Sequence, residues 1–419
     1  MKQNKTIFLL LFPLCLSFSS CSNKVSTKDP IIDEYKDISF TFCANCDDLT
    51  AVVYQELIEE YKKTIDYNVD IQFFGRMGEA GSLYDVDLWL GQTAQIKNYA
   101  NLGLYAPLYD SFRKEVEDRT NHAVVEHYMK DGKLYAFPVN YSIWDYFFYD
   151  SSKLSKEDFS SWTTLINKVK QLNMKISLPI SYEPYLGGCY FGSGISTKAE
   201  YILVDESDGQ TFNGPEKKTV ITKVTDNFNS SKAKKVSKAL ATVFGSGVVD
   251  FNGYEPNLNN EYVAVFDYYS YIALEKYQSY FGDNLAYIDI PPIEYEGKIY
   301  QWNHALEMNG LIVLEQEDVV KKYEIMQFAS YISNQSSQTK LSKILMDKYK
   351  LKMTDKTLFD PNDEARLKMA NDYRTVLCKP SLFCDLFRSV VDNSANLTDE
   401  MVNQIHEEYH KNVMALANK

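Results

Sequence analysis

Two short motifs in this chain carry residue types that can do covalent or metal chemistry. Cys43 and Cys46 form a Cys-Ala-Asn-Cys pair between a predicted strand and a predicted helix, where the helix N-terminus would lower a thiol pKa. His406 and His410 flank Glu407 in a His-Glu-x-x-His pattern, which on a helix places two imidazoles on one face for zinc. The first motif predicts a thiol oxidoreductase and the second a zinc hydrolase.

Both motifs lack part of the surroundings that their chemistry needs. No Trp precedes Cys43, and a redox domain of roughly 100 residues would leave most of the chain unexplained. Only nine residues follow His410 and none is His, Asp or Glu, so a third zinc ligand has to come from upstream. The same stretch predicts a helix that buries Met401, Ile405 and Tyr409. We therefore expect no metal and no cofactor, and an exported thiol oxidoreductase stays as an alternative.

Phosphate and nucleic-acid chemistry are also poor explanations for this chain. Gly209 and Gly214 have the spacing of a phosphate-binding loop, but Pro215 stands where that loop requires lysine. The 419 residues include 44 Lys plus Arg and 57 Asp plus Glu, a net charge of -13. So acidic a chain offers no broad basic surface to DNA or RNA, and we expect no nucleic-acid partner.

A third set of residues suits reversible binding of a sugar. A sugar ring has an apolar C–H face and a rim of hydroxyl groups, and an aromatic plate edged by carboxylates and amides matches both. The chain holds 32 Tyr, 23 Phe and 4 Trp, and a hydrophobic core explains so many tyrosines less well than the Phe. The candidate ligand-binding residues are Asn45, Asp47, Asp48, Trp89, Gln92, Tyr269 and Tyr271. Simpler roles are open for some of them: Trp89 as a core residue, and Asp47 or Asp48 as a helix N-cap.

These candidates follow elements that the pattern of apolar residues predicts. Residues 38–42 form a strand, a helix follows Asp48, and residues 69–74 and 86–89 form two more strands. A strand, helix and strand within ~35 residues make a βαβ unit, so the fold class is α/β with a largely parallel sheet. Trp89 then lies at the C-terminal end of a strand, the edge where open parallel sheets bind ligands.

The rest of the chain continues this alternation. We expect strands at residues 134–139, 144–149, 176–180, 263–266, 285–290 and 311–314, and helices at 162–171, at 233–244 and through most of the chain from 319 onward. Residues 205–235 are polar and rich in Gly, Ser and Lys, and we interpret them as a surface excursion.

The N-terminus has the pattern of an export signal. Lys2 and Lys5 precede an apolar run at residues 7–16, which is shorter than the ~20 residues that span a bilayer. Residues 18–21 (FSSC) resemble a bacterial lipobox. That resemblance implies that residues 1–20 are a signal peptide and that Cys21 carries a lipid. A plain secretory signal is the alternative.

A polar stretch separates this signal from the first strand. With Cys21 it forms a lipidated tether at residues 21–37, and the ~16 residues after Cys21 would reach ~20–25 Å if flexible. Export also leaves open whether Cys43 with Cys46, or Cys378 with Cys384, close short disulfide loops.

The order of the segments resembles the family 1 extracellular solute-binding proteins, the maltose-binding-protein-like group that feeds ABC importers. The resemblance rests on residues 85–89 (DVDLW), 99–108 (YANLGLYAPL), 131–138 (DGKLYAFP), 183–185 (EPY) and the helix at 320–333 with its following glutamines. The chain departs from the family late, where Trp-bearing segments are replaced by Tyr268 to Tyr271 and by Phe383 and Cys384. Substrate identity therefore does not carry over.

The resemblance implies a two-lobed periplasmic-binding-protein-like fold of type II, with a hinge crossed near residues 140–142, 300–301 and 334. Residues 38–140 plus 302–333 would form the N-terminal lobe, and residues 141–301 plus 334–419 the C-terminal lobe. The matching positions add five ligand-binding candidates: Ser142, Glu183, Tyr185, Trp302 and Asn303. Trp302 could instead be a packed hinge residue.

The sequence therefore predicts a lipid-anchored substrate-binding subunit of an ABC importer that captures a sugar or oligosaccharide between two lobes and does no chemistry. Contacts that both lobes make at once would favour the closed state. We expect a monomer on the outer face of the cell membrane, or in the periplasm, with the importer's permease subunits as partners. A non-sugar solute, such as a polyamine or peptide, is the alternative within the same fold.

Overall fold

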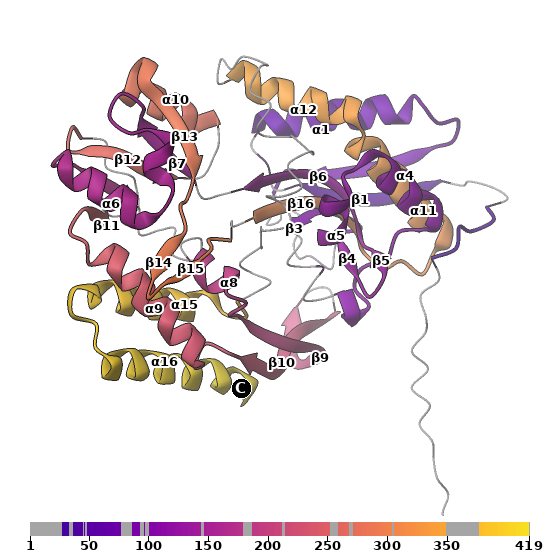
Figure 1. Cartoon of the computed structure of the whole chain (residues 1–419). Helices are drawn as coiled ribbons and strands as arrows, with labels where there is room; N and C mark the ends of the chain where they lie inside the picture. Colours follow the sequence, from indigo (N-terminus) through magenta and orange to yellow (C-terminus); the bar gives the residue numbers. More distant parts are fainter. Residues whose placement is uncertain are drawn as a thin grey trace, which may run out of the picture.

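Two five-stranded sheets, each covered by helices, form the frame of the molecule (Figure 1). The computed structural model describes residues 27–32, 37–44, 46, 48–76, 86–92, 96, 100–143, 146–178, 187–211, 214–251, 259–267, 271–303, 306–348 and 377–418. Within this part of the chain no helix is both long enough and apolar enough to cross a bilayer.

The first sheet has one antiparallel strand among parallel neighbours. Its order is β2 (Val69–Phe74), β1 (Ile38–Ala44), β3 (Leu88–Gln92), β16 (Leu306–Val313) and β6 (Ala136–Ile143). Strand β16 runs antiparallel to both β3 and β6. The helices of this first lobe are α1 (Asp48–Lys62), α4 (Asp110–Arg119), α5 (His122–His127), α11 (Val319–Ser333) and α12 (Gln335–Lys348).

Aromatic side chains tie the first sheet to its helices. The ring of Phe328 in α11 lies 5.5 Å from Phe40 and 5.6 Å from Phe42, both in β1. All three side chains are at most 1% exposed. Burying large aromatic rings removes much apolar area from water, so this contact fixes α11 against the sheet.

The second sheet repeats the plan of the first. Its order is β11 (Val249–Phe251), β8 (Lys175–Leu178), β12 (Tyr262–Asp267), β7 (Tyr146–Asp150) and β13 (Leu285–Asp289), with β7 antiparallel to its neighbours. The helices of this second lobe are α6 (Trp162–Gln171), α8 (Gly188–Gly192), α9 (Ser231–Phe244), α10 (Tyr271–Phe281), α15 (Pro380–Asp392) and α16 (Asp399–Met414). On one face, Phe148 of β7 stacks on Tyr277 of α10, with ring centroids 4.6 Å apart.

The chain passes between the sheets at points close to those that the sequence indicates. It leaves β6 at Ile143 and enters β7 at Tyr146, and it returns from Asn303 to β16 at Leu306. A crossing near residue 334 is not seen, because α12 packs on α1 and α11 and Leu341 belongs to the first core. The next described residue, Leu377, belongs to the second core.

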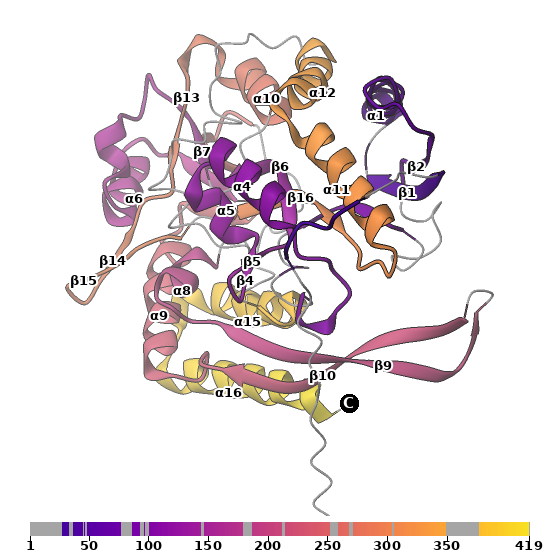
Figure 2. The same cartoon turned by 90° about the vertical axis from the view of Figure 1, so that its right-hand side faces the viewer.

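Residues 205–235, expected as a surface excursion, contain regular secondary structure that the sequence does not predict. A long hairpin of β9 (Thr197–Thr211) and β10 (Gly214–Asp226) occupies most of this stretch and extends away from the second lobe (Figure 2). At its base the ribbon packs on the second core through Val224, with Ala199 and Ile221 against that core. Residues 205–218 are polar and lack the apolar alternation that marks a half-buried strand, so the sequence does not indicate the strands there. Strand β9 also lies against a short helical turn of the first lobe, η2 (Ala100–Leu102).

Candidate functional site

The C-terminal ends of the parallel strands form one edge on each sheet. Strands β1, β2, β3 and β6 run in the same direction, so Ala44, Phe74, Gln92 and Ile143 end at a common edge of the first sheet. In the second sheet, Asp267 ends β12 and Asp289 ends β13, and both pair with Tyr146 at the start of β7. Because only two residues separate Ile143 from Tyr146, the two edges come close together at this crossing. Open α/β sheets bind ligands outside such edges.

Trp89 is the second residue of β3 and not its last, because the strand continues to Gln92 instead of ending at residue 89 as the sequence predicts. It pairs with Ile312 of β16 and with Cys43 of β1. Its ring lies along its own strand over Gly91, since a Cβ on Gly91 would come within 2.7 Å of two atoms of the indole. The indole Nε1 is buried and has no hydrogen-bond partner among the described residues. A buried N–H of this kind needs an acceptor, and a ligand oxygen is one that a binding site would supply.

Asp87 holds the start of β3 in place. Its carboxylate accepts hydrogen bonds from the Thr41 backbone N–H at 2.8 Å and from the Thr41 hydroxyl at 3.2 Å. Lys321 of α11 forms an ion pair with the same carboxylate at 3.0 Å. The Asp-Val-Asp-Leu-Trp motif therefore contributes a positioning carboxylate two residues before the indole.

Register places two more candidates on this edge. Gln92 lies opposite Asn309 of β16, and Asn309 lies opposite Asn140 of β6. Ser142 lies opposite Glu307, two pairs nearer to the crossing. Polar residues from three adjacent strands thus gather where the first sheet ends.

Asp48 begins α1 directly after the first strand. Its carboxylate is 95% exposed and lies 3.6 Å from the guanidinium of Arg76. Asp48 is thus the first residue of α1 and not its N-cap, and its negative charge is favourable in the first turn of a helix. The same exposure leaves the carboxylate available to a solute.

Trp302 and Asn303 pack against α8 rather than lining an open surface. The Trp302 side chain is 3% exposed and belongs to the second core. A Cβ on Gly188 would lie 2.3 Å from Trp302 Nε1, and the backbone N–H of Asn303 donates to Gly188 O at 3.1 Å. The packed-hinge role fits Trp302 as the structure places it.

The remaining candidates are described in part or not at all. The structure gives the backbone of Ser142 and Tyr271, at the end of β6 and the start of α10. Asn45, Asp47, Glu183, Tyr185 and Tyr269, together with the proposed lipid site Cys21, lie outside the described residues.

The second edge holds a carboxylate that sequence reasoning missed. Asp267 ends β12, is 3% exposed, and accepts a hydrogen bond of 2.5 Å from the Tyr277 hydroxyl. The sequence held a signal for it, because Asp267 stands at the end of a buried apolar strand, where open α/β sheets bind ligands.

The Cys-Ala-Asn-Cys motif does not have the exposure of a redox pair. Cys43 is fully buried in β1, between Phe74 and Trp89 in register, and Cys46 is half-buried. Catalytic thiols are partly exposed so that a substrate disulfide can reach the thiolate. We expect the purified protein to show no insulin-disulfide reduction above the background rate, whereas turnover at a thioredoxin-like rate would restore the oxidoreductase hypothesis.

The His-Glu-x-x-His motif serves packing in this structure. His406 Nδ1 lies 2.5 Å from the carbonyl of Phe228, which can only accept, so Nδ1 carries the proton. Nε2 lies 2.6 Å from the Ser237 hydroxyl and is left to accept. His410 Nδ1 pairs with Asp226 at 2.6 Å. Both nitrogens of His406 are thus engaged, and no group of three metal-ligating side chains occurs among the described residues.

Burial of His406 also corrects the predicted packing face of this helix. The buried residues of α16 are Val402, His406, Tyr409 and Val413, while Met401 and Ile405 are half-buried. The buried face of α16 is therefore displaced by about one residue from the face that the sequence predicts. The imidazole can occupy the core because both of its nitrogens have partners.

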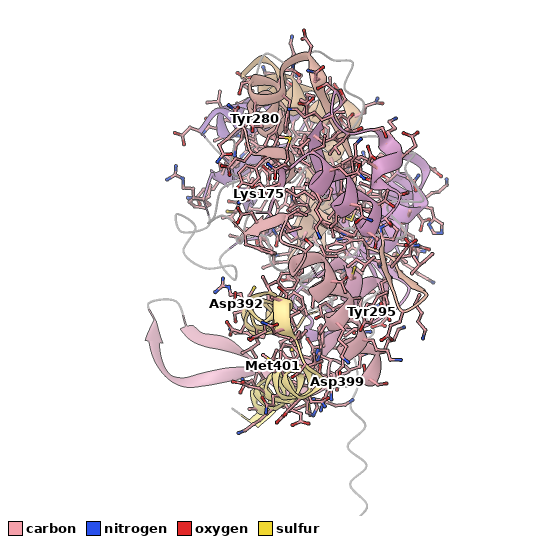
Figure 3. The ribbon with its side chains drawn as sticks, turned by 60° about the vertical axis from the view of Figure 1, so that its left-hand side comes forward. Lys175, Tyr280, Tyr295, Asp392, Asp399 and Met401 are labelled. Atoms are coloured by element: carbon pink, nitrogen blue, oxygen red, sulfur yellow. The ribbon has the colours of Figure 1, made fainter. Side chains whose placement is uncertain are left out.

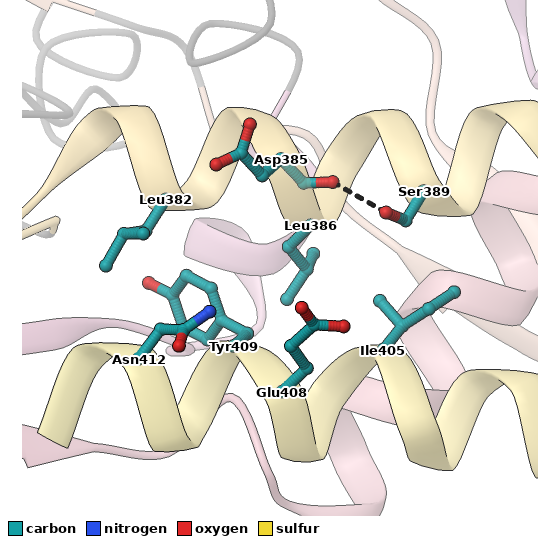
Figure 4. Close-up of a pocket in the computed structure, with 8 residues that line it drawn as sticks. All are labelled: Leu382, Asp385, Leu386, Ser389, Ile405, Glu408, Tyr409 and Asn412. Atoms are coloured by element: carbon teal, nitrogen blue, oxygen red, sulfur yellow. Dashed lines mark hydrogen bonds between the residues drawn. The ribbon is translucent and has the colours of Figure 1, made fainter. Parts of the chain in front are cut away.

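A small groove lies between α15 and α16 of the second lobe. Its volume is about 210 Å³, and Figure 4 shows its lining residues, among them Leu386 on α15 and Glu408 on α16. Figure 3 shows Asp392, Asp399 and Met401 at this end of the second lobe, away from Lys175 and Tyr280, which mark its sheet and α10. The groove shares no residue with the predicted ligand set.

Two α/β lobes with facing sheet edges and repeated chain crossings define a two-lobed solute-binding fold. The family described as "Bacterial extracellular solute-binding protein" matches residues 62–349, and the chain belongs to this family. Its members are binding proteins, which fits the expectation that the chain is not an enzyme. A search of curated proteins finds no match.

Solved structures with the same fold cover almost the whole chain. The maltodextrin-binding protein MalE1 from L. casei BL23, without ligand, is 16% identical to this chain, with a TM-score of 0.61. The match covers 91% of this chain and 100% of that chain. The GacH receptor of Streptomyces glaucescens, described unliganded and with acarbose, shares 15% identity, TM-score 0.57, with 91% and 99% covered. The extracellular solute-binding protein from Staphylococcus aureus with maltose shares 14% identity, TM-score 0.55, with 91% and 98% covered. At these identities the likeness establishes the two-lobed fold.

Proposed function

We propose that this protein captures a carbohydrate between its two lobes and delivers it to an ABC importer. The observation that carries the proposal is Trp89, which lies on a strand that ends at the first sheet edge and has a buried indole N–H with no partner among the described residues. An indole face suits sugar C–H groups and its N–H suits a hydroxyl oxygen. The family and the titles of the structural neighbours, which name maltodextrin, acarbose and maltose, support the same ligand class.

A thermal-shift screen against a carbohydrate library tests the ligand class. A ligand that binds only the folded state stabilises it by RT ln(1 + [L]/Kd), about 2.7 kcal/mol at a hundredfold excess over Kd. We expect at least one mono- or oligosaccharide to raise the melting temperature in a concentration-dependent way. A library in which no sugar shifts the melting temperature would refute the carbohydrate assignment.

Replacing Trp89 by alanine is expected to weaken the best sugar by roughly 30-fold, or about 2 kcal/mol, because an aromatic anchor is lost. Isothermal titration calorimetry measures the change. Trp162→Phe is the control variant, since Trp162 is a tryptophan buried in the second core that is not a ligand-binding candidate. Unchanged affinity in Trp89→Ala would remove the indole from the site.

A cationic solute is the second candidate, and a specific observation favours it. Asp48, Asp267 and Asp289 place carboxylates at the two edges, in a chain whose net charge is -13. Such carboxylates would suit the ammonium groups of a polyamine or a basic peptide. Spermidine and putrescine belong in the same screen, and a shift from them with none from sugars would select this alternative.

The anchor, partners and lobe boundaries belong to the same proposal. Cleavage before Cys21 and lipidation of its sulfur would hold a monomer at the outer face of the membrane, next to the permease subunits. Packing supports a lobe division in which residues 37–143 and 306–348 form one lobe and residues 146–303 and 377–418 the other. Residues 335–348 change sides relative to the division expected from the sequence.

A further inference from the structure

Residues ahead of the first strand contact the body of the first lobe. The carbonyl of Thr27 accepts a hydrogen bond from the Asp110 N–H at 2.7 Å. The carboxylate of Asp29 accepts from the Ser111 N–H at 3.1 Å and also from the Ser111 hydroxyl. Both amides belong to the first turn of α4, whose first N–H groups have no partner within the helix. This short segment therefore supplies the hydrogen bonds that begin α4.

Helix α4 depends on this segment because it has no side-chain cap of its own. Its N-cap residue, Tyr109, makes no side-chain capping bond. A carboxylate is among the best capping groups, and its charge is favourable at a helix N-terminus. The charge of Asp29 is also felt nearby: burial, then Glu315 and Asp29, raise the pKa of Tyr109 to about 12. Asp29 is thus placed as a remote N-cap for α4.

These contacts shorten the free chain between Cys21 and the first lobe. As a flexible linker through residue 37 it could extend to ~55 Å and let any face of the protein approach the bilayer. With Thr27 and Asp29 held on α4, only residues 22–26 lie between Cys21 and the docked segment. Their maximum span is ~20 Å.

We propose that docking of residues 27–29 on α4 holds the α4 end of the first lobe toward the membrane. The proposal rests on the lipidation of Cys21 in the proposed function. The anchor would then orient the protein as well as retain it, with the second lobe farther from the bilayer. Figure 1 shows α4 and α6 on opposite sides of the molecule, so these two helices report the orientation.

Energy transfer to a membrane dye tests this orientation in the lipidated, full-length protein. A donor is placed at Lys114 of α4, whose side chain is 74% exposed, or at Lys170, which is exposed on α6. The acceptor is a headgroup-labelled lipid in vesicles of phosphatidylglycerol and phosphatidylethanolamine. We expect strong transfer from Lys114 and weak transfer from Lys170. Equal transfer from both positions in the unmodified protein would overturn the proposal.

Variants in the docked segment separate capping from general damage. Asp29→Ala removes the cap and should bring the two transfer efficiencies close together, because the body can turn on a longer linker. Asp29→Asn keeps a capping side chain, and Ile31→Ala changes a residue that is 93% exposed in the same segment, so both should behave as the unmodified protein. If the two transfer efficiencies differ as much in Asp29→Ala as in the unmodified protein, docking of residues 27–29 on α4 does not set the orientation.

Hydrogen exchange distinguishes a failure of this inference from a failure of the anchor. The amides of Asp110 and Ser111 should exchange about fivefold faster in Asp29→Ala than in Asp29→Asn, whether or not the protein carries lipid. If the protein is recovered from the medium rather than from membranes, the lipid anchor is wrong, and with it the membrane orientation. If exchange is the same in both variants, the docking itself is wrong.

Discussion

Alanine in place of Gly188 should lower the free energy of unfolding by about 3 kcal/mol, the upper part of the range for overpacking a filled site. A Cβ at this position would lie 2.3 Å from Nε1 and 2.4 Å from Cδ1 of Trp302, and 2.5 Å from the backbone oxygen of Asn303. The indole has little room to retreat, because it is 3% exposed in the second core. Relief therefore requires movement of the segment that carries Trp302 and Asn303.

That segment also leads to a crossing between the lobes, since β16 begins soon after Asn303. We therefore expect Gly188→Ala to change ligand affinity as well as stability. Urea unfolding at pH 7.5 gives the stability, and calorimetry with the best ligand gives the affinity.

Gly75→Ala is the matched control for this variant. A Cβ on Gly75 would meet only the Ala51 Cβ, at an ordinary 3.7 Å. The control should stay within about 0.5 kcal/mol of the unmodified protein. A Gly188→Ala variant that unfolds at the same urea concentration as Gly75→Ala would show that the close approach of Trp302 to α8 carries no energetic weight.

Periodicity was enough to predict most of the elements that form the two sheets. The prediction for residues 69–74 coincides with β2, and that for 162–171 with α6, because both segments bury one face against a core. The fold class and the family followed from the order of such segments. Local patterns of this kind are strong where a single face is buried.

Contacts between distant residues explain what the sequence could not predict. The polar residues 205–218 give no periodic signal for the hairpin of β9 and β10, and the capping of α4 by Asp29 joins residues 82 positions apart. The sequence argued against a zinc site at His406 but could not predict what its imidazole bonds instead, because Ser237 lies 169 positions away. A motif gives the residue types but not the hydrogen bonds that decide their role.

His406 should make the stability of the protein depend on pH. Burial is the main cause that lowers the pKa of this imidazole to about 4, from an ordinary value of 6.5. Above pH 6.5 the ring is neutral in both the folded and the unfolded chain, so its contribution to stability is fully present. As the pH falls from 6.5 toward 4, only the unfolded chain takes up the proton, and the free energy of unfolding falls by ~3 kcal/mol in total.

Non-titrating variants isolate this effect. His406→Gln and His406→Asn should be less stable than the unmodified protein at pH 8, because Phe228 O and Ser237 lose a well-placed partner. The deficit should shrink by ~3 kcal/mol between pH 7.5 and pH 4, since the variants have no proton to gain at this position. Urea unfolding at half-unit pH steps measures the difference.

Comparison with the variants also removes other titrating groups from the result. Glu324 is buried and accepts from the Tyr61 hydroxyl at 2.8 Å, and burial raises the pKa of its carboxyl, so it favours the folded state as the pH falls. That contribution has the opposite sign to that of His406, but it is common to all three proteins and cancels in the difference. A deficit that stays constant from pH 7.5 to pH 4 would mean that His406 titrates normally, and hence that the contact of His406 with Ser237 is open to water.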